Sequence, residues 1–384
     1  MKTAKVLWGA TDFGAPQFSG DILWKTGFRA PDPFFIADIE GEVYIFVSAL
    51  EYDRAKKETE SGEVLLAERG LGSLADFLKK NRVRQIEIPA AFPHGQALAL
   101  KKEFRVAVKE APMYPERLRK TKWEIEEIVK SQRALERALR RAFDFLRACG
   151  IRGDIVIDGT RAVTSELLRA MIDNDLFREG FLGVNTIVSS GFQAADPHAT
   201  GSGPLEAHKP IVIDIFPVSL ATHYYADMTR TVFKGEPSEE YARMYETVRA
   251  AQSQAIAAIR AGADGKEICD GARRYFEEAG YPTRIGGKKS EGFIHGLGHG
   301  VGIDIHEPPS LGARRVLLEA GNMVTVEPGL YYPRASRLIG TRGAHGGRNT
   351  IPAGGIRIED MVLVTRRACK NFTRFKKNLA SVIL

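Results

Sequence analysis

The sequence predicts an α/β (or α+β) protein of two domains. The chain has 384 residues, which exceeds the usual size of a single domain and allows a large core. Strand-like and helix-like segments alternate along the first part of the chain, and a second set with longer helices follows. Pro112 and Pro115 lie between the two sets, and proline favours extended backbone in the residue before it. We therefore expect a small N-terminal α/β domain over residues 1–112 and a larger domain over residues 113–384.

The composition is ordinary for a globular protein. Hydrophobic residues make up 44% of the chain and charged residues 27%. The apolar runs are too short to span a bilayer, and the N-terminus lacks the apolar core of a signal peptide. Three widely spaced cysteines imply neither a disulfide framework nor a cysteine metal cage, so we expect a cytoplasmic protein. The net charge of +7 comes from scattered doublets rather than a basic tract, which argues against a nucleic-acid partner.

The N-terminal domain is expected to contain a β-hairpin. Phe34–Ile39 and Val43–Val47 are strand-like and flank Glu40-Gly41-Glu42, a pattern typical of a hairpin. His94 follows Phe92-Pro93 and is expected in a loop, and no catalytic constellation is found in this domain. Two helices and two further strands are expected over Ala49–Thr59, Leu74–Lys80, Gln85–Ile88 and Phe104–Val108, respectively.

The second domain is expected to begin with a long amphipathic helix. Apolar residues recur at three- and four-residue spacing between Lys122 and Ala148, which places them on one face of a helix. Gly150 is expected to close this helix as a C-terminal cap. Further helices are expected over Ser165–Asp173, Glu239–Arg260 and Lys266–Ala279, and strands over Val184–Ser189, Pro210–Phe216, His223–Phe233, Asn322–Gly329 and Gly355–Asp360.

The most informative stretch runs from His295 to His306. Three of the eight histidines fall within these twelve positions, with four glycines between them, and so many glycines disfavour a helix. His306-Glu307 is followed by two prolines, which excludes a helical HExxH zinc motif. From Gly302 the alternation of Ile303 and Ile305 with polar residues predicts a half-buried strand. Taken alone, the stretch is also compatible with a glycine-rich turn whose histidines have no chemical role.

Four acidic residues lie on or near expected strands. Asp214 interrupts an apolar strand, and a buried carboxylate is costly unless it is paired or binds a metal. Alone, Asp214 could be a structural ion-pair partner, and Glu359 could form a surface pair with Arg357. Four carboxylates and one imidazole suit Mn²⁺, Co²⁺, Fe²⁺ or Zn²⁺, and two divalent cations would bring the formal charge of the cluster to zero. The sequence therefore predicts a two-metal site whose ligands are Asp214, Asp227, His299, Glu327 and Glu359.

These motifs resemble those of the pita-bread metallopeptidases, the family of methionine aminopeptidase, aminopeptidase P, prolidase and creatinase. The combination is highly specific, although no single motif is. The resemblance implies a pita-bread fold for residues 113–384 and a creatinase-type fold for residues 1–112, which methionine aminopeptidases usually lack. The matching segments, in the family's order, are Ile213-Asp214, Asp227 to Thr231, His295 to His306, Val326 to Gly329 and Arg357 to Asp360.

The resemblance also implies roles for individual residues, beginning with the five candidate metal ligands. His306 matches the histidine that contacts the scissile carbonyl and stabilises the oxyanion. His295 and His198 match histidines on the substrate side of the cleft. Glu327 would also move a proton to the leaving nitrogen. Arg357 matches an arginine that orients the bridging glutamate.

The implied function is that of a dimeric metallo-exopeptidase that uses two divalent metal ions, foremost Mn²⁺, to hydrolyse Xaa-Pro bonds in short peptides. Two alternatives stay open: an inactive family member that acts as a binding module, and an aminopeptidase without proline specificity. The arginine- and glycine-rich insert 331–354 is a plain surface loop or dimer contact, or else a clamp on the carboxylate of a dipeptide. The arginines of such a clamp would be Arg334, Arg337, Arg342 and Arg348.

Overall fold

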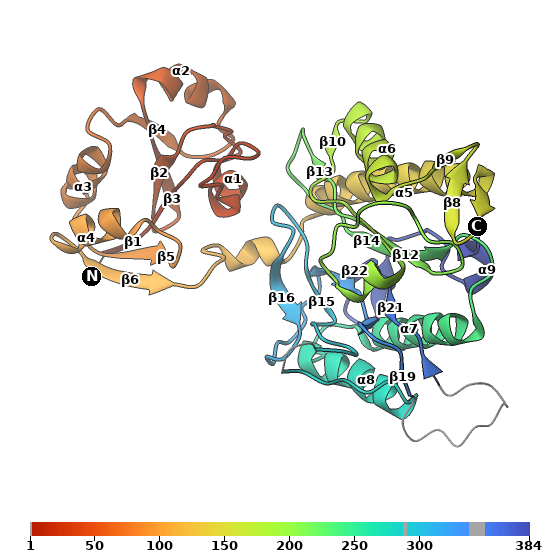
Figure 1. Cartoon of the computed structure of the whole chain (residues 1–384). Helices are drawn as coiled ribbons and strands as arrows, with labels where there is room; N and C mark the ends of the chain where they lie inside the picture. The colour runs from red at the N-terminus through yellow and green to blue at the C-terminus, as the bar shows by residue number, and fades with distance from the viewer. Residues whose placement is uncertain (1, 287–289, 338–349) are drawn as a thin grey trace. The chain divides into compact units, whose positions relative to one another are not determined.

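The computed structural model of the chain describes residues 2–286, 290–337 and 350–384. It divides into two compact units, Met1–Arg117 and Leu118–Leu384 (Figure 1). The first unit runs to Arg117, beyond Pro112, because Met113 and Tyr114 are buried in its core. The buried guanidinium of Arg117 also donates a hydrogen bond to Asp21 Oδ1 at 3.0 Å.

The first unit is a six-stranded mixed sheet with apolar clusters on both faces. Its central strand is β1 (Lys2–Gly9), which pairs antiparallel with β2 (Phe34–Ile39) and parallel with β5 (Val83–Pro89). The predicted hairpin is confirmed, since β3 (Glu42–Val47) pairs antiparallel with β2. The other elements of this unit are α1 (Gly20–Thr26), α2 (Ala49–Glu58), β4 (Glu63–Leu66), α3 (Leu71–Lys80), α4 (His94–Lys101) and β6 (Arg105–Lys109).

The two faces of this sheet bury separate cores. One cluster packs residues of α3 and α4 against the sheet, and the other packs residues of α1 and α2. The prediction of a loop around His94 is wrong, because His94 is the first residue of α4. That helix carries the buried Leu100 into the first cluster, so packing against the sheet favours a helix there.

The second unit contains several small sheets rather than one large sheet. The strand orders of the two sheets that matter most for the site are β11-β12-β14 and β16-β15-β17-β22-β23, and β18 pairs with β21. The strands of these sheets are β11 (Ile187–Ser190), β12 (Pro210–Ile215), β14 (Met228–Phe233), β15 (Gly298–Gly300), β16 (Glu307–Leu311), β17 (Met323–Val326), β18 (Gly329–Tyr332), β21 (Gly354–Arg357), β22 (Asp360–Val364) and β23 (Cys369–Asn371). The short peripheral strands are β7 (Gly150–Arg152), β8 (Ile155–Asp158), β9 (Arg161–Ala162), β10 (Phe181–Leu182), β13 (Val218–Ser219), β19 (Ser336–Arg337) and β20 (Thr350–Ile351).

Helices pack beside these strands on two sides. Figure 1 shows α5 and α6 on one side of the strands and α7 and α8 on the other. Within the described residues, no helix combines the length and the apolar composition needed to cross a bilayer. The helices are α5 (Lys122–Ala148), α6 (Ser165–Arg178), α7 (Glu239–Ala258), α8 (Gly265–Glu278) and the short α9 (Leu379–Val382), together with the 3₁₀ turn η2 (Gly191–Ala195). The 3₁₀ turn η1 (Pro115–Leu118) spans the boundary between the two units.

The long helix α5 has the predicted bounds, but it ends differently from the prediction. Thr121 and Glu124 form a capping box at its start, which fixes the first turn. At its end the C-cap residue Cys149 is extended, with φ −68° and ψ 151°. Gly150 therefore begins β7 and is not a left-handed cap, because pairing with Ile157 on β8 draws the chain into a strand.

The prediction of a strand from Gly302 to His306 is also wrong. These residues form bends between β15 and β16, and the Gly302 N–H donates to the Asp304 carbonyl at 3.1 Å. The strand lies earlier, at Gly298–Gly300, where a side chain on Gly298 would collide with the Thr325 backbone of β17. Glycine is thus required there for the close approach of two backbones. The alternation of apolar and polar residues along the sequence does not reveal such an approach.

Candidate active site

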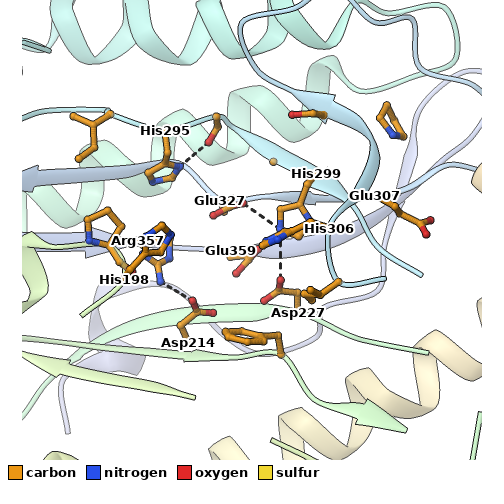
Figure 2. Close-up of a pocket in the computed structure, with 18 of the residues that line it drawn as sticks. His198, Asp214, Asp227, His295, His299, His306, Glu307, Glu327, Arg357 and Glu359 are labelled. Carbon is orange, nitrogen blue, oxygen red and sulfur yellow. Dashed lines mark hydrogen bonds and ion pairs between the residues drawn. The ribbon is translucent and has the colours of Figure 1, made fainter. Parts of the chain in front are cut away.

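All nine residues predicted for the site line one cavity in the second unit. The cavity has a volume of about 950 Å³ and combines buried acids with partly exposed histidines (Figure 2). Such a concave pocket with converging polar groups is the usual form of a small-substrate site. The nine residues are His198, Asp214, Asp227, His295, His299, His306, Glu327, Arg357 and Glu359.

Antiparallel strand pairing brings the five candidate ligands together. Asp214 lies on β12 and Asp227 directly precedes β14, its antiparallel neighbour. His299 lies on β15, next to β17. Glu327 directly follows β17, and Glu359 directly precedes β22, the other neighbour of β17. Two sheets therefore supply two acids on one side and two acids with a histidine on the other.

Three of these residues form a compact group. Asp227, His299 and Glu359 each offer one ligand atom, and these atoms lie within 4.8 Å of one another. His299 Nε2 is 3.6 Å from Asp227 Oδ2 and 3.4 Å from Glu327 Oε1, and Figure 2 shows His299 between these two acids. Asp214 completes the set on the neighbouring strand.

Two buried oxygens at this site have no hydrogen-bond partner within the described part of the chain. These atoms are Asp214 Oδ1 and Asp227 Oδ1. A buried carboxylate oxygen without a partner is costly, so these two oxygens suit the binding of a cation.

The electrostatics agree with a cation site. Burial raises the pKa of Asp227 well above its usual value, and repulsion from Glu359 and Asp214 raises it further. Burial likewise raises the pKa of Glu359 and Glu327. Burial lowers the pKa of His299, which favours the neutral imidazole that a metal requires. The residues therefore fit a divalent cation, whose charge offsets the repulsion among the acids.

Arg357 is bound to Asp214 rather than directly to a glutamate. Its Nη2 donates to Asp214 Oδ2 at 2.6 Å, and both side chains are largely buried. Its Nε donates to Thr229 Oγ1 at 3.1 Å, and that hydroxyl donates to Glu359 Oε2 at 2.8 Å. The influence of Arg357 on Glu359 therefore passes through Thr229, a residue that the sequence did not single out.

The substrate-side histidines differ in accessibility. The side chains of His306 and His198 are exposed within the cavity, and His295 is half-buried. Figure 2 shows His198 beside Arg357 and His306 beside His299. The His299 and His306 rings meet edge to face at a centroid distance of 4.3 Å. Burial lowers the pKa of His306, so it is largely neutral at pH 7 and keeps one N–H to donate.

Tyr331 is a site residue that the sequence reading missed. It is fully buried, its hydroxyl accepts a hydrogen bond from Arg357 Nη1 at 2.9 Å, and it lies 2.9 Å from His295 Nε2. Burial raises the pKa of Tyr331 to about 12, so the hydroxyl stays protonated. No signal in the sequence marks it, because tyrosine is common in strands of many kinds.

The arginine-rich insert is only partly described. Arg334 and Arg337 are exposed and do not line the cavity. Arg342 and Arg348 lie outside the described residues. A clamp by these arginines therefore stays a prediction.

Sequence comparison identifies relatives along most of the chain. The profile of Metallopeptidase family M24 matches residues 126–366. An Xaa-Pro dipeptidase from Pyrococcus furiosus is 30% identical over 341 residues, which cover 88% of this chain and 86% of that protein. An Xaa-Pro dipeptidase from Pyrococcus horikoshii is 28% identical over 376 residues, which cover 95% of this chain and 90% of that protein.

Solved structures share the fold along most of the chain. The prolidase from Pyrococcus furiosus superposes with a TM-score of 0.75 at 26% identity, over 97% of this chain and 96% of that chain. An X-Pro aminopeptidase from Thermotoga maritima superposes with a TM-score of 0.75 at 25% identity, over 97% and 96% of the two chains. An Xaa-Pro dipeptidase from Bacillus anthracis, 23% identical with a TM-score of 0.80 over 100% of this chain and 95% of that chain, confirms the fold class. The chain belongs to metallopeptidase family M24, the pita-bread metallopeptidases that its motifs resemble.

Proposed function

We propose that this protein is an exopeptidase that hydrolyses the Xaa-Pro bond of short peptides with the help of two divalent cations. The observation that carries the proposal is the convergence of the acids and His299 in one cavity, where two buried carboxylate oxygens have no hydrogen-bond partner among the described residues. The relatives named Xaa-Pro dipeptidase and prolidase support the proline specificity. We further propose Mn²⁺ as the foremost cation and a homodimer in the cytoplasm, with the N-terminal unit acting as a creatinase-type domain.

The proposed ligands of the cations are the five residues predicted from the sequence. Bound divalent cations supply Lewis acidity toward the scissile carbonyl and make a water nucleophile available at neutral pH. Asp227, His299 and Glu359 would hold one cation, because their ligand atoms already lie within 4.8 Å of one another. Asp214 and Glu327, which line the same cavity, would complete the ligand set of the two cations.

The remaining residues act on the peptide itself. His306 is exposed to the cavity and keeps an N–H, so it can donate to the carbonyl oxygen as negative charge develops there. Cleavage of the C–N bond leaves an imino nitrogen that needs a proton. Burial raises the pKa of Glu327, which suits a carboxyl group that takes a proton and delivers it to that nitrogen.

A metal-reconstitution assay tests the proposal. The purified chain is stripped with a chelator, reloaded separately with Mn²⁺, Co²⁺, Zn²⁺ or Fe²⁺, and assayed on Ala-Pro, Ala-Pro-Ala and Ala-Ala. We expect two bound ions per chain and hydrolysis of a proline peptide but not of Ala-Ala. In Glu359→Ala, metal content and activity should fall together, whereas the exposed control Asp144→Ala on α5 should retain both. A metal-loaded wild-type chain that cleaves neither proline peptide would refute the proposal.

The ratio of dipeptide to tripeptide cleavage then assigns the subclass. A dipeptidase requires the free carboxylate of the proline itself, so it cleaves Ala-Pro and spares Ala-Pro-Ala. An aminopeptidase P accepts the tripeptide. The same two substrates test the insert, since alanine at Arg334 or Arg337 should raise KM for the dipeptide alone if these side chains clamp its carboxylate.

A further inference from the structure

A buried glutamine on α7 holds the backbone behind both candidate glutamate ligands. Gln252 is completely buried. Its Nε2 donates to the carbonyl oxygen of Val326 at 2.9 Å and to that of Ile358 at 3.0 Å. These two carbonyls belong to the residues directly before Glu327 and Glu359, so one side-chain amide binds both peptide groups that lead into the ligands.

The same two peptide groups are also held at their N–H ends. The Glu327 N–H donates to the Leu297 carbonyl at 2.8 Å, within the histidine stretch. The Glu359 N–H donates to the Thr229 carbonyl at 3.1 Å, close to Asp227. Each peptide plane is therefore fixed on both sides, and Gln252 is the group that the two planes share.

Lys377 sets the orientation of this amide. Its Nζ donates to Gln252 Oε1 at 2.5 Å and also binds Asp360 Oδ2. Asp360 is held in turn by Arg230 Nη2 at 2.8 Å. Turning the amide over would place its NH₂ group against an ammonium and its oxygen against two carbonyls. The observed orientation is therefore the only one that satisfies all three partners.

We propose that Gln252 is a positioning residue of the metal centre, which sets the spacing of Glu327 and Glu359 through their backbones. The proposal rests on the proposed ligand roles of these two glutamates. Gln252 neither lines the cavity nor carries a charge, so its effect on the reaction is indirect. Residues that orient metal ligands in this way typically change metal affinity by about 10–100-fold when they are replaced.

Two substitutions separate the donor and acceptor functions of the amide. Gln252→Met keeps a similar volume and removes all three hydrogen bonds. Gln252→Glu keeps an acceptor for Lys377 but has no N–H for the two carbonyls. Gln254→Met is the matched control, because Gln254 lies on the exposed side of the same helix. Lys377→Met leaves the amide in place and removes the group that orients it, together with the ion pair to Asp360.

The measurements are the dissociation constants for Mn²⁺ by titration calorimetry, the coupling between bound Mn²⁺ ions by electron paramagnetic resonance, and the Tm of the metal-free protein. We expect both Gln252 variants to bind Mn²⁺ about 10–100-fold more weakly and to show altered coupling. Gln254→Met should match the wild type. If the Gln252 variants do not fold, Lys377→Met decides by the same two metal readouts.

The inference is overturned if the variants keep the wild-type Mn²⁺ affinity and the wild-type coupling between bound ions. If the Tm of the metal-free variants falls at the same time, Gln252 only stabilises the fold. Failure of the proposed function looks different, because the wild-type chain itself would then bind no pair of ions or leave Ala-Pro intact.

Discussion

At the residue scale, neighbouring acids of the site are neutralised in different ways. Arg357 binds one oxygen of Asp214 at 2.6 Å, and the other oxygen has no hydrogen-bond partner in the described ranges of the chain. In the part of the chain that the structure describes, no arginine or lysine binds Asp227 in this way, and burial with nearby acids raises its pKa. Asp227 therefore depends more strongly on a bound cation, and its deprotonation and metal binding should be coupled.

The histidines of the glycine-rich stretch allow a sharp test of role. His306→Ala should retain metal but lose kcat by about 10²–10³-fold, because one donor to the developing oxyanion is removed. His299→Ala should lose metal, because His299 belongs to the compact ligand group. Plasma-emission metal analysis with steady-state kinetics on Ala-Pro distinguishes the two. A His306→Ala protein that loses metal and recovers full activity in excess metal would show that the two roles are exchanged.

Hydrogen-bond polarity restricts what His295 can do. Its Nδ1 lies 2.7 Å from the Gly296 carbonyl, which can only accept, so Nδ1 carries the proton. Burial lowers the pKa of His295, so the ring is neutral and Nε2 accepts from the Tyr331 hydroxyl. That hydroxyl accepts in turn from Arg357. Both nitrogens of His295 are therefore engaged, and its contribution to a substrate is mainly the shape of its ring.

At the scale of secondary-structure elements, the position of His299 depends on how closely two strands approach each other. Gly298 of β15 lies so close to the Thr325 backbone of β17 that a Cβ there would collide with the carbonyl. Thr325 Oγ1 also accepts the His299 N–H at 3.1 Å. The histidine is thus held by the strand pair rather than by its own flexible loop.

Adding a methyl group to β15 should therefore disturb the metal site. In Gly298→Ala the strands must move apart, which we expect to destabilise the fold by about 1–3 kcal/mol and to weaken metal binding. Gly312→Ala is the control, because its nearest neighbour is Ser310 Oγ at 3.5 Å. Urea denaturation of the metal-free proteins and Mn²⁺ titration measure the two effects. Wild-type values in Gly298→Ala would contradict the strand-pair account.

Local signals explain which elements the sequence predicted well. Helix α5 has the predicted bounds because its apolar stripe and polar N-terminus are encoded within the helix itself. Strand β15 is only three residues long and is defined by pairing with distant segments, which alternation along the chain cannot detect. The same reason explains α4, whose packing against the sheet outweighs the local signal for a loop.

The residues of the candidate site were predicted from the sequence more completely than the residues that support them. The nine predicted residues line one cavity, because their chemistry and order along the chain carry the motif signal. Thr229, Tyr331 and Gln252 were missed, although they bind the site residues or the backbone beside them. Threonine, tyrosine and glutamine are common in many contexts, and only the packed structure shows that their partners are buried at the site.

At the scale of the whole molecule, the two units have separate cores. The first unit contains its own six-stranded sheet with two apolar clusters. The candidate metal ligands all lie in the second unit. Cation binding therefore acts on the stability of one unit, since a ligand stabilises only the folded part that binds it.

Calorimetry should reveal this separation as two unfolding transitions. Adding Mn²⁺ to about 100 times its Kd should stabilise the second unit by about 2.7 kcal/mol and leave the other transition in place. Leu74→Ala removes a fully buried side chain from the first unit. We expect it to lower the free energy of unfolding of that unit, which gives the metal-independent transition, by about 2–5 kcal/mol. The metal content of this variant should be unchanged. A single transition that moves as a whole with metal would contradict independent units.

The contacts of the C-terminal segment bear on the order in which the protein matures during synthesis. Lys377 Nζ holds the amide of Gln252, and the Phe375 carbonyl accepts a hydrogen bond from Arg230 at 2.8 Å. Domains fold as units while the chain emerges, so the first sheet, which is complete by Lys109, can form early. The network behind the glutamates cannot close until Lys377 has left the ribosome. The first sheet can therefore form before the candidate metal centre does, and the backbone behind the two glutamates is held only after residue 377 has been added.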